Sequence, residues 1–223
     1  MRSTLLLVAA ALCANALLRA QTHEGSAPRG SLSAGMGVEY ASYPDVTGLV
    51  NVTALPSERV PQFKSAVEFF GACTLPLSDL WLVKFEYAYT LASYSPQGAF
   101  GPASFSVAAH MPSLILQYML TDRGVYNVRV GAGGGYHFGS LAEKYLSLDD
   151  TFRGKGAGMV FELEANTAFG DHLFAFLGGN IRWEFIGSLL DASGVSPGVA
   201  SGGSGITLHS FGVGARLGAS YLF

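Results

Sequence analysis

Histidine and serine residues that could act as general base and nucleophile lie close together at two places in the chain. His209 is followed directly by Ser210, and His110 precedes Ser113 by three residues. Hydrolysis by a serine requires the hydroxyl, an imidazole and an acidic group within hydrogen-bond reach of one another. An extended chain places His209 and Ser210 on opposite faces, and neither pair reproduces a clear nucleophile–base–acid arrangement. The residues therefore predict no catalytic centre, and a third histidine, His137, is interpreted as structural.

Two further motifs could bind ions. The segments 131–135 and 154–156 are rich in glycine, but no helix follows them to present its N-terminus to a phosphate. Asp149 and Asp150, together with Glu143, could bind a divalent cation weakly, although an exposed acidic loop is the simpler interpretation. We therefore expect no metal site and no cofactor.

The composition sets the class of protein. The chain has 223 residues, of which 13% are charged and 49% hydrophobic, and its formal net charge is -3. Charged residues make up about 25% of an ordinary soluble domain, so their scarcity argues against a cytosolic enzyme with a fully solvated surface. The net charge gives no reason to expect a nucleic-acid partner, and two cysteines cannot form a disulfide framework.

The N-terminus has the layout of a secretory signal peptide. Arg2 is followed by an apolar run at 4–18, and cleavage is expected after Ala20, with Ala16 as a second candidate. The run is short for a membrane-spanning helix, which needs about 20 apolar residues. We divide the chain into a signal peptide at 1–20, a short N-terminal segment at 21–30 and one domain at 31–223.

Apolar and polar residues alternate with a period of two in eight segments of the mature chain. In each segment aromatic and aliphatic residues occupy one face, and mid-strand charges such as Lys84 and Glu86 fall on the other. Only Lys155, at a strand end, falls on the apolar face. The predicted strands are 32–40, 64–75, 80–91, 106–120, 125–138, 155–169, 173–186 and 206–223.

The apolar face is the face expected to contact lipid. A charged side chain facing lipid costs about 2–4 kcal/mol at mid-bilayer, which explains why the charges share the opposite face. A soluble lipocalin-like barrel, the alternative, would turn its apolar face inward, yet eight strands enclose little more than side-chain space. The pattern predicts an all-β protein, an eight-stranded antiparallel up-and-down transmembrane β-barrel, with aromatic girdles that include Trp81 and Trp183.

The connections between the predicted strands alternate between long and short. Long connections at 41–63, 93–105, 139–154 and 187–205 alternate with short ones at 76–79, 121–124 and 170–172. Outer-membrane barrels place short turns in the periplasm and long loops outside, so both termini are expected in the periplasm. Because lipid tolerates no open sheet edge, the first and last strands should pair.

These features resemble the small bacterial outer-membrane barrels of the OmpA, OmpX and OmpW type. The signal peptide, the eight alternating strands and a last strand ending in Tyr221 and Phe223 carry the resemblance, which spans the mature chain but includes no subfamily motif. It implies a location in the bacterial outer membrane, in contact with lipid and lipopolysaccharide. It also implies that Tyr221 and Phe223 form the assembly signal for the barrel-assembly machinery. We expect a monomer.

The charges on the polar face are expected to form an ion-pair network in the lumen, because buried charges must be paired. The expected members are Glu39, Glu68, Lys84, Glu86, Arg129, Glu162, Glu164, Arg182, Glu184 and Arg216. Counting from the strand ends predicts pairs of Arg129 with Glu164 or Glu162, Arg182 with Glu162 or Glu184, and Arg216 with Glu39.

The predicted lumen favours a structural or surface-interaction role without catalysis, with the ion pairs acting as a polar plug. Two alternatives stay open. One is a narrow pore for small solutes, including apolar ones as in OmpW-like proteins. The other is a lipid A-modifying hydrolase, because lipid A deacylases with this architecture use histidine, serine and an acidic partner.

Overall fold

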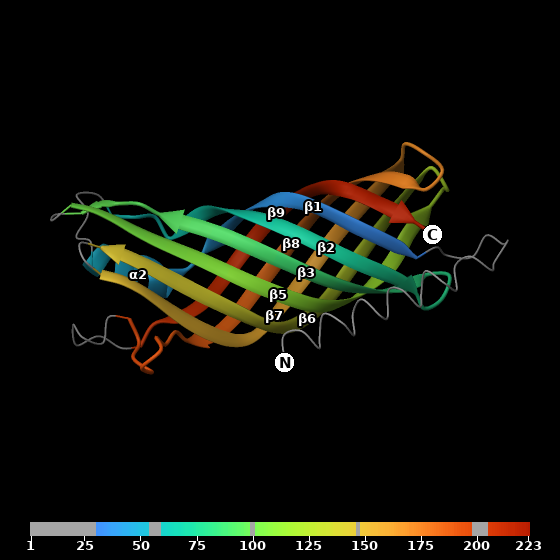
Figure 1. Cartoon of the computed structure of the whole chain (residues 1–223). Coiled ribbons are helices and arrows are strands. Elements are labelled where there is room, and N and C mark those ends of the chain that lie inside the picture. Colours follow the sequence, from blue (N-terminus) through green and yellow to red (C-terminus); the bar gives the residue numbers. More distant parts are fainter. Residues whose placement is uncertain (1–29, 54–58, 99–100, 146–147, 198–204) are drawn as a thin grey trace.

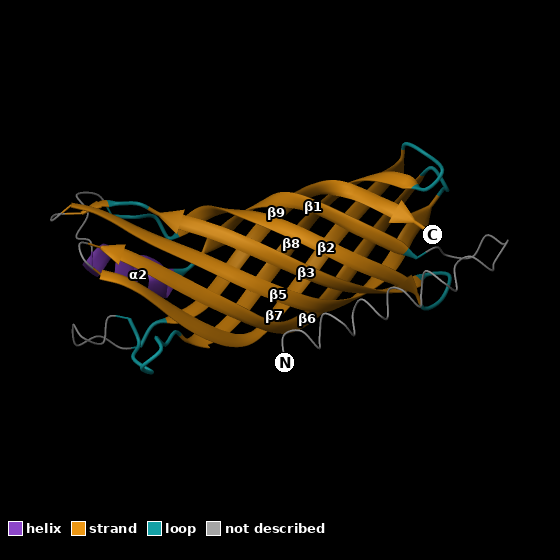
Figure 2. Cartoon of the chain, in the orientation of Figure 1, coloured by secondary structure: helices purple, strands orange, loops and turns teal. Residues whose placement is uncertain are grey.

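Long antiparallel strands account for most of the chain in the computed structural model, which describes residues 30–53, 59–98, 101–145, 148–197 and 205–223. The strands wrap into one barrel (Figures 1 and 2). The ring consists of β1 (Ser31–Ser42), β2 (Phe63–Pro76), β3 (Trp81–Tyr94), β5 (Gly101–Asp122), β6 (Tyr126–Tyr145), β7 (Leu148–Ala168), β8 (Leu173–Ser188) and β9 (Thr207–Leu222).

The ring is closed, so no strand of the barrel has a free edge. β1 pairs antiparallel with β2 and also with β9, from Ser31 opposite Leu222 to Ser42 opposite Phe211. The pairing of β3 with β5 completes the circle, and the two-residue β4 (Gln97–Gly98) only extends one hairpin. The expected pairing of the first and last strands is therefore confirmed, together with the eight-stranded antiparallel ring.

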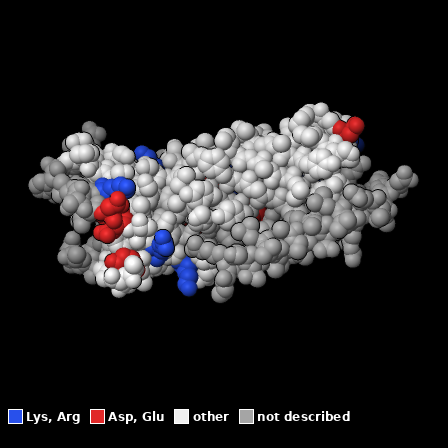
Figure 3. All heavy atoms as spheres, viewed as in Figure 1, with Lys and Arg blue, Asp and Glu red and all other residues white. Residues whose placement is uncertain are grey.

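Side chains divide between the two faces of the wall as their alternation predicts. Leu163 and Leu217 on the outer face are 52% and 60% exposed, while Arg182 on the inner face is 1% exposed. Figure 3 shows the middle of the visible outer wall almost free of charged atoms, with one small red patch near its centre, whereas most charged atoms lie toward its ends. An apolar exterior around a charged interior is the arrangement of a transmembrane barrel, and the predicted fold class is confirmed.

The two ends of the barrel differ. One end carries the short connections between β2 and β3, β5 and β6, and β7 and β8, together with the C-terminus (Figure 1). We call it the turn end. In one of these turns Gly124 has a positive φ of 73°, and its N–H donates to the Asp122 carboxylate over 2.9 Å. The predicted segments 1–20 and 21–30 lie outside the described residues, apart from Gly30.

At the opposite end, which we call the helix end, two connections differ from prediction because they are strand rather than loop. The expected long loops at 93–105 and 139–154 are largely strand, since β3 and β5 leave only a short link and β6 and β7 form a long hairpin. Beyond the membrane the outer face no longer has to be apolar, so the alternation that marks the strands fades. Cross-strand pairs such as Lys144 with Asp149, 3.2 Å apart, stabilise the extended hairpin.

The first long connection contains a helix, α2 (Pro44–Thr53), that the sequence did not predict. Pro44 suits a first helical position, and Asp45 places a negative charge in the first turn. The Asp45 carboxylate also accepts hydrogen bonds from the N–H and hydroxyl of Thr207, at 3.1 and 2.5 Å. Valine and glycine inside the segment have modest helix propensity, so tertiary packing stabilises this helix. Among the described residues, no helix is long and apolar enough to span a membrane.

We expect Leu163→Arg on the outer face of β7 to lower the free energy of unfolding by about 2–4 kcal/mol, because it places a charge against the acyl chains. Urea titration of the protein in lipid vesicles measures this loss. The matched control is Val125→Arg at the turn end, where Val125 is 63% exposed and the cost should be about 0–1 kcal/mol. Equal losses for the two variants would contradict a lipid-facing wall.

Candidate functional site

The lumen is the candidate functional site, and its helix end is filled by apolar side chains. Val46, Leu49 and Val50 of α2 are at most 6% exposed and pack inside the mouth of the barrel. We call this cluster the apolar plug. The strands contribute, among others, Phe105, Leu141, Ile186 and Leu208. The expectation of a lumen filled by charge is therefore wrong for this end, because it ignored the apolar residues that face α2.

Below the apolar plug lies a group of paired charges that we call the central network. Lys84 of β3 contacts Glu86 at 2.9 Å and Glu162 at 2.8 Å, and it also pairs with Glu164. Arg216 of β9 lies 2.5 Å from Glu68 and 2.9 Å from Glu86. Every one of these side chains is almost fully buried. The network therefore satisfies the requirement that charges removed from water be paired.

Glu86 is the hub of the central network. Its carboxylate accepts hydrogen bonds from Arg216 at 2.9 and 3.0 Å and from Arg182 at 2.5 Å, and it also contacts the Lys84 ammonium. Three cations on three different strands thus converge on one carboxylate. Removing any one of them would leave a buried negative charge short of a partner.

The ion pairs cross the lumen, whereas the sequence predicted pairs between neighbouring positions. Arg182 was expected beside Glu162 or Glu184, but it contacts Glu86 and, at 3.8 Å, Glu68. Arg216 was expected beside Glu39 and instead contacts Glu68, Glu86 and Glu162. Glycines lie on both sides of Arg216, at Gly37 and Gly178. They leave room for the guanidinium to reach across a bore that is only side chains wide.

Three predicted members of the network, Glu39, Arg129 and Glu184, stay outside it, and Glu184 pairs instead with His137. Arg129 lies opposite Glu164 in the strand register, as expected, but Glu164 pairs with Lys84. Neither Arg129 nor Glu39 forms an ion pair with another described residue. The Glu39 carboxylate instead occupies the space where a side chain at Gly212 would begin. Register alone therefore places a charge correctly without identifying its partner.

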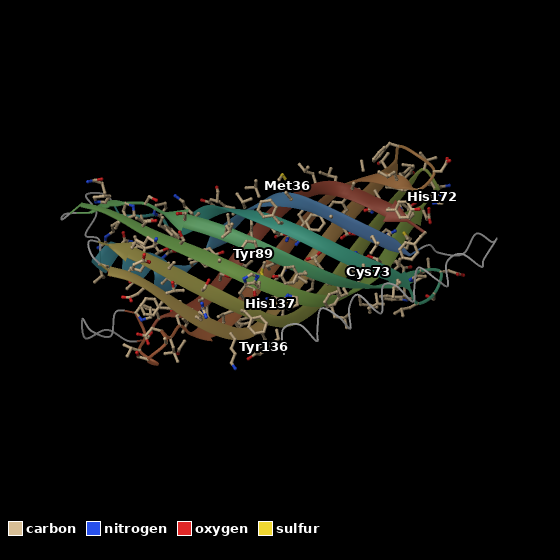
Figure 4. The ribbon with its side chains drawn as sticks, in the orientation of Figure 1. Met36, Cys73, Tyr89, Tyr136, His137 and His172 are labelled. Carbon is tan, nitrogen blue, oxygen red and sulfur yellow. The ribbon has the colours of Figure 1, made fainter. Side chains whose placement is uncertain are left out.

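A serine, a histidine and a glutamate form a connected row between the central network and the apolar plug. The Ser113 hydroxyl lies 3.1 Å from Nε2 of His137, and Nδ1 of His137 pairs with the Glu184 carboxylate. This connectivity is that of a nucleophile, a base and an acid. Figure 4 shows His137 in the barrel interior and its neighbour Tyr136 at the outside. The row was not predicted from the sequence, where the nearest histidine to Ser113 is His110, a residue that faces outward in the structure and contacts Tyr87.

The row is closed to solvent. Ser113 is 2% exposed, His137 0% and Glu184 6%. A side-chain carbon at Gly158 would collide with the His137 ring, and one at Gly135 with the carbonyl of Pro112. The surrounding backbone therefore packs tightly around the imidazole. The row also links β5, β6 and β8 through side-chain contacts.

A similar fold is found in solved structures of outer-membrane proteins. Neisserial surface protein A shares 11% identity and a TM-score of 0.52 over 87% of this chain and 97% of its own. A major outer membrane protein from Thermus thermophilus shares 15% identity and a TM-score of 0.53, over 87% and 99%. The attachment invasion locus protein Ail of Yersinia pestis shares 8% identity and a TM-score of 0.51, over 87% and 98%.

The chain has the fold of a small outer-membrane β-barrel. No protein-family model matches the sequence, and no curated protein matches it either. In this barrel the residues expected to form the assembly signal lie at the turn end. Tyr221 is 46% exposed and its ring lies 5.7 Å from that of His172, while the Phe223 N–H donates to the Gly30 carbonyl over 3.0 Å.

We expect Lys84→Met to destabilise the barrel by about 3–5 kcal/mol, because it leaves buried carboxylates without their shared cation. Glu86, Glu162 and Glu164 each offer an oxygen within 4.8 Å of the others, so their mutual repulsion adds to the loss. Urea titration in lipid vesicles measures the effect. Arg129→Met is the matched control and should cost far less, since Arg129 has no ion pair among the described residues. Similar losses would show that the network contributes nothing beyond packing.

Proposed function

We propose that this protein is an integral barrel of the bacterial outer membrane with a structural or surface-interaction role, and that it neither conducts solutes nor catalyses a reaction. The observation that carries the proposal is the filled lumen. The apolar plug closes the helix end, the central network fills the middle, and Phe70 and Phe176 meet below it with ring centroids 5.2 Å apart. In each layer the side chains contact one another, which favours a closed lumen over a continuous passage.

The proposed orientation places the turn end in the periplasm and the helix end outside the cell. Short periplasmic turns and longer external segments are the rule for such barrels. Both described termini, near Gly30 and at Phe223, then lie in the periplasm, where Tyr221 and Phe223 would be read by the barrel-assembly machinery. The expected lipid partners, including lipopolysaccharide, contact the apolar outer wall.

The length of three strands supports a role at the cell surface. β5, β6 and β7 have 22, 20 and 21 residues, whereas a transmembrane strand needs about 9–11. The excess forms an extension of paired strands at the helix end, bordered by residues 189–197. Two of the similar structures are named a surface protein and an attachment invasion locus protein. The names fit a barrel that presents its outer end to partners.

The pore alternative is tested by conductance in planar bilayers. We expect no discrete channel events from the wild-type protein, with an open porin as positive control. We also expect none from Val46→Asp combined with Val50→Asp, which disrupts the apolar plug, because the central network still blocks the bore. Wild-type events would overturn the proposal. Events confined to the double variant would show that the helix alone closes the barrel.

The hydrolase alternative is favoured by one observation, the row of Ser113, His137 and Glu184, and is tested by a fluorophosphonate probe. Such probes label serines that are both activated and accessible. We expect no labelling of the folded wild-type protein, because its Ser113 hydroxyl is buried, whereas a known serine hydrolase is labelled in parallel. Labelling that disappears in Ser113→Ala would overturn the non-catalytic assignment.

A further inference from the structure

A groove of about 590 Å³ lies on the outer wall at the helix end of the barrel. It runs along the β6–β7 hairpin and is bordered by the segment that follows β8, where Leu190 pairs with Arg153 through two backbone hydrogen bonds of 2.8 and 3.0 Å. Its lining combines hydroxyls, apolar side chains and two cations. The residues that matter here are Phe138, Ser140, Arg153, Lys155, Ser188 and Leu190.

The two cations of the groove, Arg153 and Lys155, are exposed and can reach a ligand. Arg153 and Lys155 are two residues apart on β7, so both side chains project outward, about 6.6 Å apart along the strand. Neither forms an ion pair with another described residue. Lys144, farther along the same hairpin, is already paired with Asp149. Lys155 is also the charged residue that the sequence pattern places on the apolar face. Its position in the groove accounts for this exception.

The height of the groove matches the headgroup layer of a membrane. Outward residues of β7 from Ala157 to Thr167 carry no charge. At a rise of about 3.3 Å per residue and a tilt near 40°, they span about 25 Å along the barrel axis, the height of the apolar band of such barrels. Lys155 therefore lies directly above the band, where phosphate groups are found. Long side chains reach that level readily.

We infer that this groove binds the phosphorylated headgroup of an outer-leaflet glycolipid of the lipid A class. Arg153 and Lys155 match the charge of phosphates, for which charge-assisted hydrogen bonds are strong. Ser140 and Ser188 offer hydroxyls to a sugar, while Phe138 and Leu190, 41% and 42% exposed, offer apolar contact to the lipid below. The assignment rests on the proposed orientation, which places the helix end in the outer leaflet.

The test compares retention of three lipids by the purified full-length barrel in detergent micelles, measured by native mass spectrometry. The probes are diphosphorylated lipid A, the same lipid with its phosphates removed, and phosphatidylglycerol. We expect Arg153→Gln combined with Lys155→Gln to weaken retention of diphosphorylated lipid A about tenfold, since two charge-assisted contacts are lost. Lys144→Gln, with its exposed side chain on the same hairpin, is the matched control and should bind as the wild type does.

Retention must also depend on the lipid's chemistry. The phosphate-free lipid should be retained weakly by every variant, and phosphatidylglycerol should show no dependence on Arg153 and Lys155. Undiminished binding by the double variant would overturn the inference, as would an equal loss in Lys144→Gln or an equal dependence for phosphatidylglycerol. A shift in gel mobility on boiling establishes that each variant is folded. Binding in micelles is independent of conductance and labelling, so failure here leaves the proposed function standing, and the reverse also holds.

Discussion

The constraint on which this structure depends is that an ionised side chain cannot face the acyl chains of a bilayer. Because a strand turns alternate side chains to opposite faces, every charge at the level of the acyl chains is directed into a bore too narrow for water to solvate it well. The charges must then neutralise one another, and the central network around Glu86 is the result. The same constraint that makes the outer wall apolar thus fills the interior with cross-lumen ion pairs, which tie β2, β3, β7, β8 and β9 together from within.

Filling the bore requires small residues in the wall as well as large ones in the lumen. The Glu39 carboxylate occupies the place of a side chain at Gly212, and the His137 ring occupies that of one at Gly158. At the helix end the packing is apolar instead, because α2 carries valine and leucine on the face that points into the barrel. The strands facing it contribute apolar side chains such as Phe105 and Leu141. The lumen is therefore filled by successive layers of closely packed side chains, and this favours a structural role over transport.

Much of the fold could be predicted because a period of two is a local property of the sequence. The eight strands and the face of each charge within the predicted strands follow from parity. What could not be predicted depends on contacts between distant segments. α2 is stabilised by the mouth of the barrel rather than by its own propensity, and the β6–β7 extension lies where lipid no longer imposes an apolar face. The partners of Arg182 and Arg216 lie across the lumen, and the row from Ser113 to Glu184 joins three strands whose relative register a single sequence does not reveal.

The hydrogen bonds between Asp45 and Thr207 join the first connection of the chain to the beginning of its last strand. Leu208, next to Thr207, also belongs to the cluster that receives α2. The surface on which α2 packs is therefore complete only when β9 is paired with β1. Loss of β9 from the ring would therefore remove both the hydrogen-bond donors of Asp45 and part of the apolar surface that holds α2 in the mouth of the barrel.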